Sequence, residues 1–471
     1  MARTFEMTIN GQRVPADSYV EIKNPANRSL VGLCPIGTRE HLEAAVAAAK
    51  QAFVSWRAVS DERRAEACRA IAATLIEHTP ELATLLTQEQ GKPLKGLGSE
   101  FELGGCVGWT SFVAGQSLPV KVLEDGPKSR IEQHRMPIGV VGSITPWNWP
   151  LMIAIWHIIP AVRTGNTVVI KPSPFTPLGT LRMIELISAV LPPGVVNVVT
   201  GEDQLGAELS SHPDVGKIVF TGSIPTGKKV MASAAASLKA LTLELGGNDA
   251  AIVLPDADVE RLAEGLFWGA FINSGQTCGA LKRLYVHDRV FDRTCAALAN
   301  FASRIPMGDG SEPGNLLGPL QNERQYRRVI ELVEDAKSHG GRTLLGGTPL
   351  AGEGYFYPIT LVTDVEDGTR LVDEEQFGPA LPIVRYSDLD DAIQRANGTQ
   401  FGLCASVWGS DRKTLREVAE RLEAGTVFIN KHAEIAPHVP FGGIKQSGLG
   451  VEFGQEGIEA YTTIKIINEP V

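Results

Sequence analysis

The sequence lacks the features that mark several specialised classes of protein. Its six cysteines lie far apart, with no C-x-x-C pair and no Cys/His cluster at zinc spacing. Neither a disulfide framework nor a metal site is therefore expected. No run rich in Lys and Arg occurs and the net charge is −10, which argues against nucleic acid as a partner. The chain also does not open on the continuous apolar segment of a secretory signal.

Long apolar runs are missing as well. The longest, from Trp149 to Val162, is short for a membrane span and is interrupted by Pro150, His157 and Pro160. This run predicts a buried core segment, so no membrane partner is expected. With cysteines that look unpaired, a cytoplasmic location fits best.

The residues that are present predict an ordinary α/β protein. The chain has 471 residues, 43% hydrophobic and 21% charged, which allows two or three domains. After a short strand-rich start, amphipathic spacing predicts helices over Arg39–Trp56, Glu62–His78 and Glu81–Gln90.

A regular alternation of strands and helices begins near residue 140. Apolar strand candidates start about every 25 residues, which leaves room for the crossover helix that parallel strands require. They are Val140–Ile144, Thr167–Ile170, Val195–Val199, Lys217–Phe220 and Leu241–Leu243. A second series comprises Ala251–Leu254, Arg283–Val286, Ala380–Val384 and Ala405–Trp408, with helices over Tyr326–Ser338 and Asp411–Glu423. The pattern predicts a doubly wound parallel sheet and a second α/β domain.

Two polar, alternating segments do not fit into either series. Ser129–His134 follows a turn at Asp125-Gly126-Pro127 and predicts an exposed hairpin arm. Ala460–Ile467 also alternates, and we expect it to return and pair with that arm.

Ligands bind beyond the carboxyl ends of the strands in such sheets, so the loops after the strands are the candidate sites. Asn148 lies in a loop held by prolines at both ends and could donate its amide to an oxyanion, or could simply satisfy turn backbone. Lys171 ends the second strand and could bind ribose or phosphate, or be solvated. Glu244 ends the fifth strand; it could be a general base with a raised pKa, or accept backbone N–H bonds.

Cys278 is the candidate nucleophile. A helix predicted over Arg261–Ile272 is broken by Asn273-Ser274-Gly275, which places the thiol on a loop just past the helix end. Free cysteines more often pack as small hydrophobes, and that alternative remains open for Cys278 taken alone.

The loop after Phe220 is rich in glycine and opens a helix, which suits a pyrophosphate. It is close to the P-loop motif, but Lys229 stands where the Mg²⁺-binding hydroxyl is needed, so a nucleotide hydrolase is rejected. The usual dinucleotide fingerprint G-x-G-x-x-G is absent from the chain.

Seven motifs in order resemble the NAD(P)-dependent aldehyde dehydrogenase superfamily. They are PWNWP (146–150), KPS (171–173), FTGS (220–223), LELGG (243–247), GQTC (275–278), EEQFGP (374–379) and PFGGIKQSG (440–448). The resemblance implies a Rossmann-like dinucleotide-binding domain (1–116 and 137–246), a catalytic domain (247–445) and a small β oligomerisation arm (117–136 and 456–471). It also implies a homodimer or homotetramer.

The resemblance assigns a role to each matching residue. Cys278 is similar to the nucleophile that forms a thiohemiacetal and then a thioester. Asn148 matches the oxyanion donor, and Glu244 matches the base that activates water. The implied cofactor-binding residues are Ile144, Thr145, Trp147, Lys171, Ser173, Phe220, Thr221, Gly222, Ser223, Gly227, Leu245, Glu375 and Phe377. The implied substrate pocket contains Trp149, Ile153, Trp156, Thr277, Gly279, Lys431 and His432, with the loop 431–439.

Three points stay open in the sequence. Many NAD-preferring members carry Glu where this chain has Pro174, so NAD is the expected cofactor and NADP is possible. Lys431, His432 and His438 favour a small polar or anionic aldehyde, unless they are solvated loop residues. Glu244 favours hydrolysis over transfer of the acyl group to coenzyme A, and the retained Cys278 and Glu244 argue against a non-catalytic family member.

Overall fold

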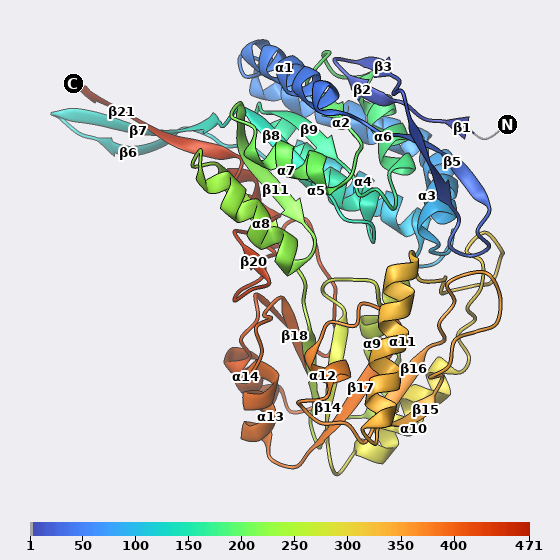
Figure 1. The fold of residues 1–471 in the computed structure, drawn as a ribbon. Helices are drawn as coiled ribbons and strands as arrows, with labels where there is room; N and C mark the ends of the chain where they lie inside the picture. Colours follow the sequence, from blue (N-terminus) through green and yellow to red (C-terminus); the bar gives the residue numbers. More distant parts are fainter. Residues whose placement is uncertain (1–2) are drawn as a thin grey trace.

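The larger of the two main sheets has eight strands and lies in the upper half of Figure 1. The structure, a computed structural model, describes residues 3–471. In spatial order the strands are β20 (Gly448–Leu449), β12 (Ala240–Glu244), β11 (Val215–Thr221), β8 (Val140–Ile144), β9 (Thr167–Lys171), β10 (Val196–Val198), β2 (Met7–Ile9) and β3 (Gln12–Val14). The strands from β12 to β10 run parallel, and β20, β2 and β3 pair antiparallel at the edges. Strand order reverses between β8 and β11, so the predicted doubly wound sheet is confirmed.

Helices cover this sheet and make its crossovers. They are α1 (Arg39–Trp56), α2 (Asp61–Glu77), α3 (Thr79–Gln90), α4 (Ser99–Ala114), α5 (Pro150–Arg163), α6 (Leu178–Ser188), α7 (Asp203–Ser211) and α8 (Ile224–Ala235). The apolar run predicted to be a core segment forms α5, every residue of which is buried. Among the described residues, no helix has both the length and the apolarity needed to cross a bilayer.

Helix α4 was not expected from the sequence. Its glycines at 104, 105 and 108 are poor helix formers, so its residues give a weak helical signal. The fold uses one of them for close packing, since a Cβ on Gly105 would come within 2.5 Å of Met152 Sδ on α5. Tertiary packing therefore overrides local propensity in this helix.

The second sheet has seven strands and lies below the first in Figure 1. In order they are β15 (Arg342–Leu345), β16 (Thr360–Thr363), β17 (Ala380–Tyr386), β14 (Leu281–His287), β13 (Asp249–Val253), β18 (Cys404–Trp408) and β19 (Thr426–Ile429). All but β15 are parallel to their neighbours. The associated helices are α9 (Val259–Phe271), η1 (Ile272–Gly275), α10 (Phe291–Ala302), α11 (Glu323–Ser338), α12 (Arg370–Asp373), α13 (Leu389–Asn397) and α14 (Arg412–Arg421).

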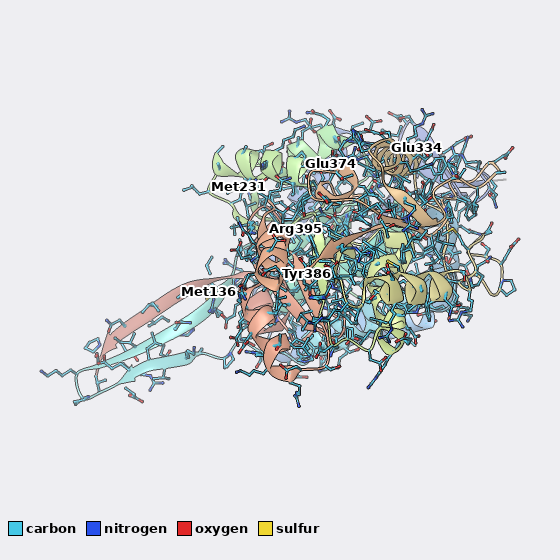
Figure 2. The ribbon with its side chains drawn as sticks, turned by 90° about the horizontal axis from the view of Figure 1, so that it is seen from below. Met136, Met231, Glu334, Glu374, Tyr386 and Arg395 are labelled. Carbon is cyan, nitrogen blue, oxygen red and sulfur yellow. The ribbon has the colours of Figure 1, made fainter. Side chains whose placement is uncertain are left out.

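A three-stranded arm projects from the body of the molecule (Figure 2), with Met136 near its base. It consists of β6 (Lys121–Asp125), β7 (Ser129–Pro137) and β21 (Thr462–Pro470), in the order β21-β7-β6. The predicted return of the late segment to pair with the Ser129 strand is confirmed, with Ile464 opposite Arg135. The remaining elements are β1 (Arg3–Thr4), β4 (Tyr19–Lys23), β5 (Leu30–Pro35) and α15 (Gly454–Glu459).

Candidate active site

Four strand ends bring polar residues to one edge of the larger sheet. Ile144 at the end of β8 pairs with Lys171 at the end of β9, and Thr221 of β11 pairs with Glu244 of β12. Phe220 pairs with Ile144, so the two halves are in register. This edge lies at the reversal of strand order, where ligands bind in open α/β sheets.

Cys278 lies on a loop between η1 and β14, as the sequence predicted. The helix ends in three successive residues with positive φ: Asn273 (52°), Ser274 (55°) and Gly275 (74°). Left-handed backbone is unfavourable for Asn and Ser, so this turn is strained, and strain of this kind is concentrated at functional sites. The other five cysteines are buried, whereas Cys278 is partly exposed.

The loop that carries Asn148 is bonded directly to the cysteine loop. Asn148 Nδ2 donates to the Gln276 carbonyl at 3.0 Å, and Trp149 Nε1 donates to Thr277 Oγ1 at 3.0 Å. One of the two amide hydrogens of Asn148 is left for another acceptor. The structure therefore brings Asn148 to the residues that immediately precede Cys278.

Glu244 is a buried carboxyl group with an unsatisfied oxygen. Only 4% of the residue is exposed, and its Oε1 accepts no hydrogen bond within the described residues. Burial raises the pKa of Glu244 well above its usual value, and the charge of Glu452 raises it further. A carboxyl group whose pKa is raised in this way suits general acid–base chemistry.

The charges around Cys278 oppose one another. Burial raises the pKa of the thiol to about 12, the positive charge of Lys282 lowers it, and the carboxylates of Glu244, Glu375 and Asp249 raise it. Lys282 is the single cation among these charges. Its Nζ donates to the Cys278 carbonyl at 2.6 Å.

Several residues predicted to bind a dinucleotide have free bonding capacity at the sheet edge. Lys171 is buried and its Nζ donates to the Pro172 carbonyl, which leaves ammonium hydrogens for a ligand. Burial lowers the pKa of Lys171 to about 8. Thr145 Oγ1 is buried and has no partner in the part of the chain that the structure describes. Ser223 caps α8 by accepting a bond from the Thr226 N–H.

Other predicted cofactor residues lie around the glycines that follow the strands. Glu375 Oε1 accepts the Gly247 N–H at 3.2 Å, and the rings of Phe377 and Trp147 lie edge to face, 5.3 Å apart. A Cβ on Gly227 would come within 2.5 Å of Leu245. Ser173 is buried, and its Oγ accepts from the Phe175 N–H. The remaining members, Phe220 and Gly222, follow the register of β11 to the same edge.

A chain of aromatic rings leads away from the cysteine loop. A Cβ on Gly279 would lie 3.9 Å from the ring of Phe441, whose ring centroid is 6.0 Å from that of Phe453. Phe453 in turn lies 4.7 Å from Trp156, and Trp156 lies 5.5 Å from Trp109. Trp156 was predicted from the sequence, as were Trp149, Ile153 and Thr277 near it. Phe441, Phe453 and Trp109 were not.

His432 was predicted to line the substrate pocket, and its neighbours in the structure are Ser406 and Asp249. Its ring is buried, Nδ1 lies 2.9 Å from Ser406 Oγ, and Nε2 lies 3.7 Å from Asp249. Lys431 instead forms an exposed ion pair with Glu434 at 2.9 Å. Polarity alone could not reveal these orientations, because strand β19 ends just before the loop and the direction of each side chain depends on the backbone there. Of the three residues that suggested a polar substrate, Lys431 is paired, His432 is buried and His438 is exposed.

Two charged residues near the cysteine were missed. Lys282 lies in the buried strand β14, and a charged residue in such a strand was a usable signal because a buried charge requires a partner. Glu452 lies 3.2 Å from His157 Nε2, and both side chains are buried. Nothing in the sequence near Glu452 indicated that this late segment of the chain returns to lie beside Glu244.

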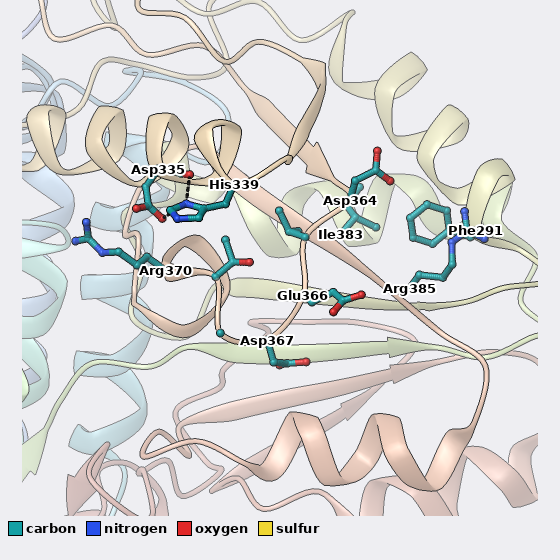
Figure 3. A pocket seen from close by; sticks show the side chains of 12 residues that line it. Phe291, Asp335, His339, Asp364, Glu366, Asp367, Arg370, Ile383 and Arg385 are labelled. Carbon is teal, nitrogen blue, oxygen red and sulfur yellow. Dashed lines mark hydrogen bonds and ion pairs between the residues drawn. The ribbon is translucent and has the colours of Figure 1, made fainter.

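A wide pocket of about 780 Å³ lies elsewhere, on the second α/β unit (Figure 3). Its charged lining residues include Asp364, Asp367 and Arg385, which are held in ion pairs with Arg342, Arg395 and Asp288. None of the predicted site residues lines it. Its size therefore carries no argument about catalysis.

Comparison with known proteins identifies the family of the chain. A model of the aldehyde dehydrogenase family matches residues 13–467. A probable aldehyde dehydrogenase from a Pseudomonas species is 40% identical, over 98% of this chain and 94% of its own. An NADP-dependent enzyme from E. coli superposes with a TM-score of 0.97 at 37% identity, over 100% and 98% of the two chains. The NAD+ complex of an aldehyde dehydrogenase from Bacillus cereus superposes with a TM-score of 0.97 at 35% identity, over 100% and 97%. The chain belongs to the aldehyde dehydrogenase family.

Proposed function

We propose that the protein oxidises an aldehyde to its carboxylic acid through a covalent intermediate on Cys278. The thiolate attacks the carbonyl carbon, and the carbonyl oxygen becomes the alkoxide of a thiohemiacetal. The free amide hydrogen of Asn148 and the backbone N–H of Cys278 stabilise that alkoxide. The observation that most strongly supports these roles is the hydrogen bond from the Asn148 amide to the carbonyl of Gln276, two residues before the nucleophile.

The strand edge fits a nicotinamide dinucleotide. Lys171 and Thr145 have unused bonding capacity there, and the glycine-rich start of α8 suits a pyrophosphate. Glu375 and Phe377 would hold the nicotinamide ribose, beside Trp147. When bound, the cofactor would accept the hydride that leaves the thiohemiacetal. Loss of this hydride converts the thiohemiacetal on Cys278 into a thioester.

Glu244 would complete the reaction by hydrolysis. In its ionised form the carboxylate accepts a proton from water, the hydroxide attacks the thioester, and the Cys278 thiolate leaves with release of the acid. The unsatisfied oxygen and raised pKa of Glu244 support this role. A coenzyme-A-acylating reaction would have no use for this base.

We favour NAD over NADP as the cofactor. Pro174 is exposed beside Lys171 and offers no carboxylate, but Asp203 and Glu202 place negative charge near Lys171. Such charge would repel a 2′-phosphate. The similar Bacillus cereus enzyme forms an NAD+ complex, whereas the similar E. coli enzyme is NADP dependent, so the two cofactors have to be compared directly.

The substrate class is better inferred from the aromatic rings than from the loop charges. The rings from Phe441 to Trp109 form a continuous apolar cluster that begins beside the cysteine loop, whereas Lys431 is paired with Glu434 and His432 is buried. These contacts support an aldehyde with an apolar or aromatic group in place of the polar or anionic one expected from the sequence.

The test is an assay of NAD(P)H absorbance with polar, anionic, aliphatic and aromatic aldehydes. Each aldehyde is tested with NAD and with NADP, without coenzyme A, beside the Cys278→Ala variant. We expect turnover with apolar aldehydes and NAD that disappears in the variant. Turnover only after addition of coenzyme A would contradict hydrolysis, and a preference for anionic aldehydes would contradict the proposed substrate class.

We also propose that the arm joins copies of this chain into a homodimer or homotetramer in the cytoplasm. Its strands expose Val122, Leu123, Ile464 and Ile466, each by about half of its surface or more (47, 54, 57 and 50%). Apolar side chains on both outer strands of a projecting sheet favour burial against another subunit. Because both outer strands expose apolar residues, we propose that the arm of a second copy of this chain covers them.

A further inference from the structure

Lys282 is a buried lysine at the centre of the site, and no step proposed above uses it. Its side chain is 2% exposed. Nζ donates to the carbonyls of Cys278 at 2.6 Å, Thr277 at 2.9 Å and, more weakly, Ala280 at 3.4 Å. It also lies 3.5 Å from Glu375 Oε1. One ammonium group therefore contacts both the nucleophile loop and the residue proposed to hold the nicotinamide ribose.

Backbone carbonyls alone do not explain a buried ammonium group. Placing an unpaired charge in the interior is costly, and an amide or hydroxyl side chain could also bond to carbonyls without that cost. The carboxylate of Glu375 pairs with Lys282 in part, at a distance longer than a good hydrogen bond. Glu375 therefore neutralises the ammonium charge of Lys282 only in part, and the remaining positive charge is expected to act on ionisable groups nearby.

The thiol of Cys278 is the group on which that charge can act. Around it are the carboxyls of Glu244 from β12, Asp249 from β13 and Glu375 from the loop after α12, together with the thiol of Cys404 from β18. The three carboxyls, when ionised, disfavour a negative charge on Cys278. Lys282, from β14, is the single cation in the set. The nucleophile is the thiolate, so the surrounding anions would suppress the reaction unless a cation opposed them.

We propose that Lys282 is a positioning residue for the reaction: its ammonium group fixes the Cys278 loop through the carbonyls of that loop, and its charge, balanced by Glu375, sets the fraction of Cys278 present as thiolate. Lys282 acts through Cys278 and does not contact the substrate carbonyl. The inference rests on the proposed function only in that Cys278 is the nucleophile.

The test measures alkylation of Cys278 by iodoacetamide as a function of pH, in the absence of aldehyde and cofactor. The five other cysteines are buried, and the Cys278→Ala variant gives the background. Between about pH 7 and 10 the rate follows the thiolate fraction, so loss of the cation in Lys282→Gln is expected to slow alkylation about tenfold at each pH, a displacement of about one pH unit toward alkaline pH. Glutamine keeps a donor for the carbonyls, so the change reports charge.

Two further variants separate charge from structure. Lys239→Met is the matched control, because Lys239 is also buried and donates to two carbonyls, those of His212 and Val215, far from the cysteine loop. The curve of alkylation rate against pH for Lys239→Met should coincide with that of the wild type.

Glu375→Gln is the second variant. It removes an anion beside the thiol and should displace the curve of alkylation rate toward lower pH, which loss of structure would not do. This variant also decides the question if Lys282→Gln fails to fold. An unchanged curve in folded Lys282→Gln, or no acid displacement in Glu375→Gln, would overturn the proposal. Because no turnover is measured, this outcome is independent of whether the enzyme oxidises aldehydes.

Discussion

Among single residues, Glu244 has the clearest consequence for kinetics. Replacing Glu244 with Gln removes the base that activates water and leaves the attack by Cys278 intact. We expect the steady-state kcat to fall by about 10²–10⁴-fold, the usual contribution of general base catalysis. A burst of one equivalent of NAD(P)H should remain, seen by rapid mixing, with an acyl adduct on Cys278 in the mass spectrum.

The control for that experiment is Glu420→Gln, a change to an exposed carboxylate in α14 that should leave both phases as in the wild type. Loss of the burst together with the steady rate in Glu244→Gln would show that Glu244 acts before the thioester forms. That result would contradict the assigned role.

The pH dependence of the wild type follows from the same residue. Because burial and Glu452 raise the pKa of Glu244 above its usual value, its carboxyl group keeps its proton to a higher pH than an ordinary glutamate does. The base form then increases with pH, so kcat limited by hydrolysis should rise over a pH range that lies above the one in which an ordinary glutamate titrates. Steady-state assays in overlapping buffers measure this. A kcat that is flat or falls over that range would show that hydrolysis does not limit turnover or that Glu244 is not the base.

At the scale of elements, the loop that carries Asn148 rests on a buried ion pair. Lys92, two residues past the end of α3, contacts Glu102 of α4 at 2.6 Å, and neither side chain is exposed. Lys92 Nζ also donates to the Asn148 carbonyl, and Glu102 accepts the N–H groups of Leu151 and Met152 at the start of α5. The ion pair of Lys92 and Glu102 thus joins helices α4 and α5 to the loop that carries Asn148.

Breaking this pair should be more damaging than replacing it. We expect Lys92→Met to cost about 3–5 kcal/mol by leaving the Glu102 carboxylate buried and unpaired. The double variant Lys92→Met/Glu102→Gln should recover part of the loss. Thermal unfolding midpoints measure both, with Lys95→Met as the control, because its pair with Glu100 is exposed. A Lys92→Met midpoint equal to that of Lys95→Met would contradict the prediction.

The same scale shows what the sequence could predict and what it could not. The central strands β8, β9, β13 and β17 were predictable because their apolar runs are continuous and bounded by turn residues. Outer strands such as β16 and β19 are only four residues long, so their apolar runs are too short to establish a period. Site residues at strand ends were predictable from the parallel sheet. Lys282, Glu452 and the burial of His432 were not, because they depend on contacts between segments far apart in the chain.

At the scale of the whole molecule, the arm should determine assembly. The double variant Ile464→Glu/Ile466→Glu places two charges on β21 where both isoleucines are half exposed. We expect the oligomer to dissociate toward the monomer, since burying the charges against another arm is unfavourable. Light scattering after gel filtration gives the mass. Ile76→Glu on α2, where the isoleucine is 61% exposed, is the matched control and should leave the mass unchanged. An unchanged mass in the double variant would exclude this surface of the arm from the interface.

The pairing of the arm also bears on the order of events during synthesis. Strand β7 has β6 on one edge and β21 on the other, and more than three hundred residues separate Arg135 from its partner Ile464. The larger sheet likewise receives β20 only after the whole second α/β unit has been made. Domains form as the polypeptide leaves the ribosome, N-terminal parts first. A nascent chain therefore carries an open edge on β7 until Thr462–Pro470 emerges, so subunits that need a complete arm meet only after translation of that segment.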